Sequence, residues 1–391
     1  MKNLITNKKI FYSGLVYFIC ILLFIGARIL WGTGFLSGID PLWGDLIFSI
    51  VIQLVILTAL PLLLWKTLCK QTFKQTAEHF FIRKISFRTV VYSILLGILV
   101  YVLIIFVSTF WSLILSFFGY SPSGGGTTTD LPVWLAFIVS IVSTSFLPGF
   151  GEEMAHRGML LGNARGNGLK RAILITALMF ALAHLNISQA GYAFVVGLIL
   201  GASTLITRSI WPAVIVHATS NFCSVYMSFA EANGWLGGSI TSTMTNFITQ
   251  NWLAGLIVSF LILMIVLTLI AIIISRFFEQ TKYKRFQEFC TRLKSSVTGT
   301  QLEKEIDFND KLQLYTLYSQ AAAKDLKDKV ESGQLPISHL EKEVGNNPLY
   351  SMLYSEFDEY KKPNSIDYLF YYITIFMAGI VTLITLIWGI L

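Results

Sequence analysis

The chain has 391 residues, of which 54% are hydrophobic and only 13% are charged. A soluble globular domain usually carries about 25% charged residues, so this composition excludes an ordinary soluble fold. The formal net charge is +7, and the basic residues fall in the segments between long apolar runs. This placement is typical of a membrane protein and gives no reason to expect a nucleic-acid partner.

Several apolar stretches reach the roughly 20 residues that a helix needs to cross a bilayer. The strongest are 10–31, 45–65, 88–118, 252–277 and 367–391. A helix satisfies all its backbone hydrogen bonds internally, which a chain in lipid requires. We therefore predict an all-α fold, a polytopic transmembrane helical bundle of about 8 to 10 membrane helices.

The basic residues alternate along the chain and predict its orientation, because short Lys- and Arg-rich loops stay in the cytoplasm. The basic segments are 1–9, 66–88, 162–171, Arg208 and 276–366, and the segments without Lys or Arg are 32–44, 119–131, 185–189 and 230–251. We expect a multi-pass protein of the cell membrane with a cytoplasmic N-terminus. Arg28 lies near an outer end, where we expect its long stem to snorkel to the interface, with a pairing role as the alternative.

Composition divides the chain into five parts. They are N-terminal membrane helices (1–131), a central core (132–229), an outer loop and membrane helix (230–278), a cytosolic helical domain (279–366) and a C-terminal membrane helix (367–391). The polar part mixes charged residues with helix formers and shows no catalytic constellation.

The central core concentrates polar groups that are expensive inside a membrane, and each is a functional candidate for that reason. Glu152 and His184 each lie 13 residues from the basic turn near 165–171, or about 20 Å at the helical rise, so they are expected at the same depth. His217 and Asn221 are four residues apart and share one helical face. All four are expected to meet in one polar pocket.

Such a set has a definite chemistry. A carboxylate beside an imidazole can hold and deprotonate a water molecule, and a histidine with an asparagine can bind the water, a metal ion or a developing oxyanion. Arg157 follows Glu153 by four residues and is expected to pair with it along one helical face, which keeps that carboxylate ionised. Taken singly, each residue has a plainer interpretation as an interhelical hydrogen-bond partner or a structural clamp.

Three motifs occur here in order. Residues 152–157 read EEMAHR and fit EExxxR, residues 180–184 read FALAH and fit FxxxH, and residues 217–221 read HATSN and fit HxxxN. Over about 130–230 the chain resembles the CAAX protease and bacteriocin-processing family, which includes the CAAX prenyl endoproteases and the bacterial Abi-type bacteriocin-immunity proteins. His156 departs from the aromatic residue common at its position.

The resemblance implies roles for the motif residues. Glu152 would be the general base that activates water together with His184, His217 and Asn221 would complete the site, and Glu153 with Arg157 would support it. The participation of a metal stays open, because two histidines, a carboxylate and an amide suit zinc while an HExxH pairing is absent. His184 and His217 are the candidate ligands for Zn²⁺.

Three functions compete at this point. The leading hypothesis is an intramembrane endopeptidase that cleaves a membrane-associated or lipidated peptide or protein, with the lipid bilayer and that substrate as its partners. The alternative is a noncatalytic bacteriocin-immunity protein or scaffold whose polar cluster only locks helices together. A transporter also places polar residues at the midplane, but no inverted repeat is visible.

Overall fold

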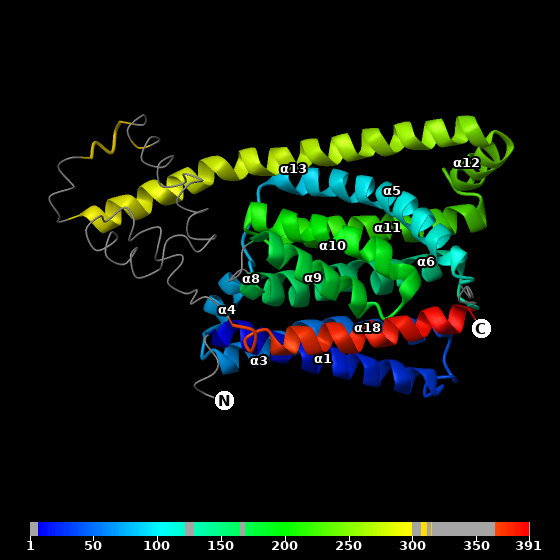
Figure 1. Ribbon diagram of the computed structural model, residues 1–391, viewed down its shortest axis with the longest axis horizontal. Helices are drawn as coiled ribbons and strands as arrows, with labels where there is room; N and C mark the ends of the chain where they lie inside the picture. The colour runs from blue at the N-terminus through cyan, green and yellow to red at the C-terminus, as the bar shows by residue number, and fades with distance from the viewer. Residues whose placement is uncertain are drawn as a thin grey trace.

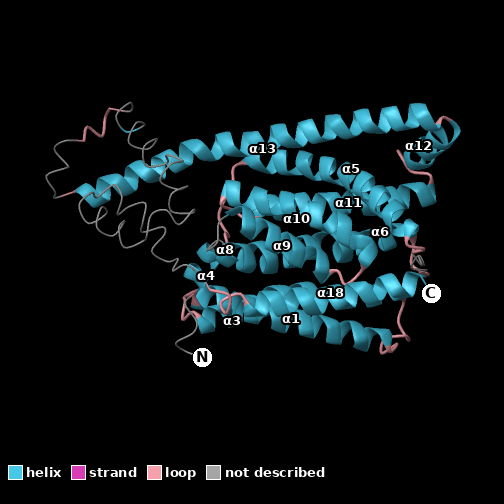
Figure 2. Ribbon diagram, viewed as in Figure 1, coloured by secondary structure: helices cyan, strands magenta, loops and turns pink. Residues whose placement is uncertain are grey.

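The computed structural model describes residues 7–121, 129–164, 169–298, 306–310, 314 and 364–390. Within these ranges every regular element is a helix and no strand occurs (Figure 2). The predicted all-α fold is confirmed.

The chain contributes helices of very different lengths. Those before the central core are α1 (Lys8–Gly32), α2 (Pro41–Ser49), η1 (Ile50–Ala59), α3 (Leu60–Leu68), α4 (Phe73–His79) and α5 (Phe87–Phe117). Those of the central core are α6 (Val133–Ile141), η2 (Val142–Phe146), α7 (Leu147–Glu153), η3 (Met154–Leu161), α8 (Gly162–Ala164), α9 (Leu169–Ala183), α10 (Ile187–Thr207) and α11 (Trp211–Asn233). The remaining helices are α12 (Ser239–Gln250), α13 (Trp252–Val297) and α18 (Leu369–Ile390).

Seven helical runs among the described residues are long and apolar enough to cross a membrane. They are Lys8–Gly32, Pro41–Leu68, Phe87–Phe117, Val133–Ala164, Ile187–Thr207, Trp252–Thr281 and Leu369–Ile390. Helix α9 is only 15 residues long and α11 carries several polar residues, yet both pack inside the same bundle (Figure 1). Large apolar side chains lie exposed on the outer helices, which is expected where the neighbour is lipid.

The helices are arranged around a central group of α9, α10 and α11 (Figure 1). Helices α1 and α18 lie together on one side of this group, and α5 and α13 lie on the other. The N-terminus, α4 and α8 lie at one end of the bundle, whereas the C-terminus and α12 lie at the opposite end. The central core is therefore covered by helices from both ends of the sequence.

Small side chains allow close helix packing around the central core. Ser49 Oγ donates to the carbonyl of Ser143 at 2.7 Å, and Ser145 Oγ donates to the carbonyl of Ala218 at 2.6 Å. A Cβ added to Gly97 would lie 2.5 Å from the Thr219 side chain, so α5 and α11 approach at a position that requires glycine. In a bilayer the hydrophobic effect contributes little to the association of helices. Small residues and interhelical hydrogen bonds therefore usually hold membrane helices together.

Three of these helical segments, η1, η2 and η3, are π-helical. Each of them continues directly from or into an α-helix of the same span. Insertions of this kind are rare in helices and occur mostly at functional sites, because they change which side chains face a neighbouring helix. All three segments adjoin α7, which carries the two glutamates of the EExxxR motif, and η3 carries the arginine.

The polar part of the chain begins inside a long helix. Helix α13 continues from Trp252 to Val297, past the predicted boundary between membrane helix and cytosolic domain at 278/279. Most of the predicted cytosolic domain, 299–305, 311–313 and 315–363, lies outside the described residues, as does much of the outer segment 119–131. The predicted division into five parts stays a prediction.

Candidate active site

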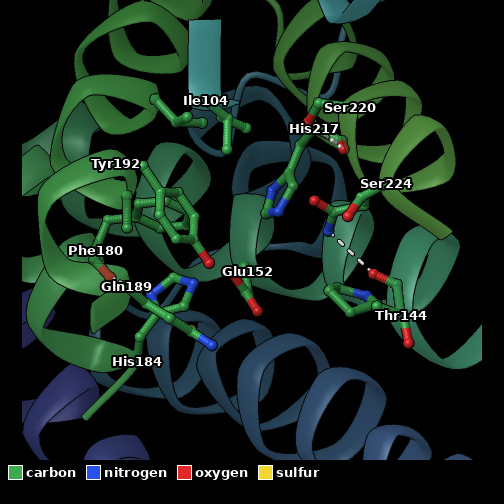
Figure 3. Close-up of a pocket in the computed structure, with 14 residues that line it drawn as sticks. Ile104, Thr144, Glu152, Phe180, His184, Gln189, Tyr192, His217, Ser220 and Ser224 are labelled. Carbon is green, nitrogen blue, oxygen red and sulfur yellow. Dashed lines mark hydrogen bonds between the residues drawn. The ribbon is translucent and has the colours of Figure 1, made fainter. Parts of the chain in front are cut away.

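A cavity of about 270 Å³ lies inside the central group of helices. Its lining comes from α5, η2, α7, α10 and α11 and from the end of α9 (Figure 3). Four of its lining residues are the motif residues Glu152, His184, His217 and Asn221. The structure thus brings together in one place the four side chains that the sequence assigns to one pocket.

Glu152 lies near the C-terminal end of α7, and its half-buried carboxylate faces the cavity (Figure 3). Gln53 of η1 donates its side-chain amide to Glu152 Oε1 at 3.2 Å. The two helices approach at Gly151, where an added Cβ would lie 2.5 Å from the carbonyl oxygen of Gln53. The glycine before the motif therefore allows a buried amide to hold one oxygen of the carboxylate and leaves the other toward the cavity.

His184 lies just beyond the last residue of α9, where the chain turns into α10. Its Nδ1 lies 2.9 Å from the carbonyl oxygen of Phe180, one turn earlier. A carbonyl oxygen only accepts, so Nδ1 carries the proton and Nε2 of the neutral ring has a free lone pair. The ring is thereby oriented as a hydrogen-bond acceptor toward the cavity.

Other helices hold the turn that carries His184. Leu185 adopts the left-handed conformation with φ of 51°. Arg28 Nη1 donates to the carbonyl of His184 at 3.2 Å, Trp111 Nε1 donates to the carbonyl of Ile187 at 2.7 Å, and the Ile187 amide donates to Thr385 Oγ1 at 2.9 Å. Arg28 is exposed, and the hydrogen bond to His184 is the pairing that the sequence left as an alternative to snorkelling. Its partner is a carbonyl at a helix C-terminus.

Asn221 is anchored to a backbone carbonyl that lies one turn before a proline on a neighbouring helix. Pro148 has no N–H, so it cannot donate to the carbonyl of Thr144 four residues before it. The side-chain amide of Asn221 donates to this carbonyl at 3.0 Å. One of the two amide hydrogens of Asn221 is thus engaged, and the second is available to the cavity.

Behind the cavity lies a fully buried ion pair of Glu153 and Arg157, and His217 connects this pair to the cavity wall. Glu153 Oε1 accepts from Arg157 Nη1 at 2.8 Å and from His217 Nδ1 at 2.9 Å, and the side chains of Glu153 and Arg157 are 0% and 1% exposed. Arg157 also lies 4.4 Å from the ring centre of Phe180 and donates to the carbonyl of Gly197 at 3.2 Å. The predicted pairing of Glu153 with Arg157 is present, and the contact with His217 adds a link between the first and third motifs.

His156 lies outside the cavity lining. Its Nδ1 donates to the backbone carbonyl of Glu152 at 2.7 Å, which leaves Nε2 to accept from the Tyr17 hydroxyl at 2.7 Å. The ring is 1% exposed and meets the rings of Tyr17 and Phe180 edge to face. A histidine can replace the aromatic residue expected here because both ring nitrogens have buried partners.

The zinc ligation predicted for His184 and His217 rests on donors that line the cavity. Each ring has its Nδ1 engaged and presents Nε2 as the free nitrogen. Over the described parts of the chain, however, no three His, Cys, Asp or Glu side chains converge closely enough to hold a metal ion. The fit to a protein-bound zinc site is therefore incomplete, and zinc stays a prediction.

Two contributors to the site are absent from the motifs. Gln53 belongs to the N-terminal membrane helices, and Tyr192 lies between the second and third motifs, where it lines the cavity. Gln53 stands out in the sequence as an amide within the apolar run 45–65, which is the signal that identifies polar residues inside a membrane. Tyr192 has no comparable signal, because tyrosines are frequent in this chain.

The fold and the cavity define a polytopic helical membrane protein whose central core encloses a carboxylate, two histidines and an asparagine. Residues 133–223 match the family described as type II CAAX prenyl endopeptidase Rce1-like. The match runs from the first residue of α6 into α11, and so it includes all three motifs. The resemblance to this family is confirmed over that segment, and it indicates a CAAX-type protease, which is a hydrolase.

The two other comparisons give no match. Neither a curated protein nor a solved structure matches the chain. The description of the segments before residue 133 and after residue 223 therefore rests on their sequence and structure alone.

Proposed function

We propose that the chain is an intramembrane endopeptidase in which Glu152 and His184 activate a water molecule for attack on a peptide carbonyl. The observation that carries this proposal is the division between two neighbouring polar layers. Glu153 is fully buried and binds both Arg157 and His217 Nδ1, whereas the Glu152 carboxylate and His184 Nε2 face an open cavity that His217 also lines. A cluster that only locks helices together would satisfy its polar groups with one another and leave no such space.

The reaction follows from these groups. Glu152 accepts a proton from the water, His184 Nε2 accepts the hydrogen bond from the other water hydrogen, and the water oxygen bonds to the carbonyl carbon. The electron pair of the C=O bond moves to oxygen and forms a tetrahedral intermediate. When the C–N bond breaks, Glu152 returns the proton to the leaving nitrogen, so the carboxylate is regenerated.

The supporting residues hold the reacting groups in place. Gln53 fixes one oxygen of Glu152, and Glu153 fixes the ring of His217 through Nδ1. The ion pair with Arg157 keeps Glu153 available as an acceptor at a depth where a lone carboxylate would be costly. A site held in this way needs little reorganisation during the reaction.

The proposed substrate is a membrane-associated or lipidated peptide or protein. The cavity combines the polar motif groups with apolar walls that include Ile104, Phe180 and Val196. Because it lies among membrane helices, a substrate that is already in the bilayer reaches it without leaving lipid. The family match supports a peptide substrate and does not by itself select a prenylated one.

The proposed location is the cell membrane, with the N-terminus in the cytoplasm. The N-terminus, α4 and α8 lie at one end of the bundle (Figure 1). The described parts of three basic segments, 7–9, 66–88 and 169–171, belong to this end, which agrees with the rule that basic loops face the cytoplasm. A cysteine-accessibility measurement on intact cells, with single cysteines placed at Lys74 and Ser239, tests this orientation.

The noncatalytic alternative remains a bacteriocin-immunity protein or a scaffold. It predicts that the buried layer matters and that Glu152 does not. Glu152→Gln separates the two functions, because the variant keeps the size of the side chain and an oxygen that can accept from Gln53 but cannot act as a base. Loss of peptide cleavage in this variant supports the endopeptidase.

A further inference from the structure

The hydrogen bonds of the motif residues leave few donors for the oxygen that becomes negative during peptide cleavage. His184 donates Nδ1–H to the carbonyl of Phe180, and His217 donates Nδ1–H to Glu153. In the neutral tautomers that these contacts select, both Nε2 atoms are acceptors. Neither ring in this state can donate to an oxyanion.

Two polar residues on α11 also use donors away from the cavity. Ser220 Oγ donates to the carbonyl of His217 at 2.9 Å, and Asn221 uses one amide hydrogen on Thr144. Among the motif residues, only the second amide hydrogen of Asn221 remains. Three further lining side chains, those of Thr144, Gln189 and Ser224, make no side-chain hydrogen bond among the described residues, but Tyr192 is the one whose hydroxyl lies beside both Glu152 and His184. Oxyanions in acyl transfer are usually held by two or more donors, and each donor contributes substantially to the rate.

Tyr192 of α10 presents a hydroxyl to this space. Figure 3 shows the hydroxyl pointing toward the region between Glu152 and His184. It has no hydrogen-bond partner among the described residues. Buried tyrosine hydroxyls normally find a partner, and those of Tyr17, Tyr368 and Tyr371 do so here.

The backbone beside Tyr192 is held closely. Gly191 packs against Trp111 of α5, and a Cβ added to Gly191 would lie 2.6 Å from that indole ring. Trp111 also donates to the carbonyl of Ile187 at the start of α10. The helix that carries Tyr192 is therefore fixed against α5, and its unpartnered hydroxyl is presented from a rigid position, as a catalytic donor requires.

We propose that Tyr192 is a further catalytic residue whose hydroxyl donates a hydrogen bond to the carbonyl oxygen of the scissile peptide as that oxygen becomes an oxyanion. This inference rests on the proposed function and adds a residue to it. The proton stays on the tyrosine, so the proton balance between water, Glu152 and the leaving nitrogen is unchanged. Asn221 supplies the second donor through its remaining amide hydrogen.

The test is Tyr192→Phe, with Tyr101→Phe as the matched control. Tyr101 lies on α5 in the same bundle, makes no hydrogen bond through its hydroxyl among the described residues, and does not line the cavity. Wild type and both variants are purified in detergent and assayed with a quenched peptide that the wild type cleaves. The kcat, the KM and the midpoint of thermal unfolding are measured for each protein.

We expect Tyr192→Phe to lower kcat by about 100- to 1000-fold, as for the loss of an oxyanion donor, with KM and the unfolding midpoint unchanged. Tyr101→Phe should match the wild type in all three quantities. A kcat for Tyr192→Phe within twofold of wild type would overturn the inference and leave the proposed function intact, and so would a fall in the unfolding midpoint that accounts for the lost activity. Wild-type protein that cleaves no peptide of the panel would contradict the proposed function itself.

Discussion

Glu152 and Glu153 follow each other in the chain, yet their side chains lie in different surroundings. The Glu152 carboxylate faces the cavity and accepts from Gln53, whereas Glu153 is completely buried between Arg157 and His217. Neighbouring residues on a helix point about 100° apart, so one turn can serve both the cavity and the layer behind it. Substitution of Glu152 should accordingly reduce peptide cleavage, whereas substitution of Glu153 should reduce the stability of the fold.

The first prediction concerns the buried ion pair. Glu153→Leu should lower the free energy of unfolding by about 3–5 kcal/mol, because Arg157 is left as an uncompensated buried charge. The double variant Glu153→Leu with Arg157→Met should recover most of this loss, since both charges are then absent. Thermal or denaturant unfolding in detergent measures both effects. Equal stability of the single variant and the wild type would show that the pair contributes nothing.

The second prediction concerns Tyr17 and His156. Tyr17→Phe should reduce stability by about 1–3 kcal/mol, because the buried Nε2 of His156 loses its only donor. It should leave kcat close to that of the wild type, because neither residue lines the cavity. The same chemical change thus has opposite expected effects at Tyr17 and Tyr192. A large loss of kcat in Tyr17→Phe without a loss of stability would place His156 in the reaction.

The third prediction concerns Gln53. Gln53→Leu should lower kcat about tenfold, the equivalent of roughly one charge-assisted hydrogen bond to Glu152. Stability should not fall, because the Oε1 atom of Gln53 is buried without a partner and its removal relieves that cost. Steady-state kinetics and thermal unfolding are the measurements. Unchanged kcat would mean that Glu152 keeps its orientation without the amide.

The membrane spans could be predicted closely from the sequence. The predicted run 88–118 is Phe87–Phe117 in the structure, and the predicted run 10–31 is Lys8–Gly32. Long apolar stretches bounded by charged or polar segments leave little choice of structure in a bilayer. The depth argument for Glu152 and His184 also agrees with the cavity that both residues line, because the helical rise is nearly constant.

The contacts across helices could not be predicted in this way. The π-helical segment η1 has no signature in the apolar run that contains it, yet it carries Gln53 to Glu152. Hydropathy gives the length of a span but not the rotation of one helix against another. For the same reason the three motifs give the reacting groups, whereas Tyr192 depends on how α10 packs against α5.

Comparison of peptide cleavage by the wild type and Glu152→Gln tests the central claim most directly. Both proteins are purified in detergent, with Glu231→Gln on the exposed end of α11 as the matched control, and given a panel of quenched membrane and C-terminal peptides. We predict cleavage by the wild type and by Glu231→Gln, and a loss of at least about 100-fold in Glu152→Gln, the lower end of what a general base contributes. A parallel assay with a chelator tests the predicted zinc. Equal cleavage by wild type and Glu152→Gln would contradict the account, and the polar cluster would then be structural.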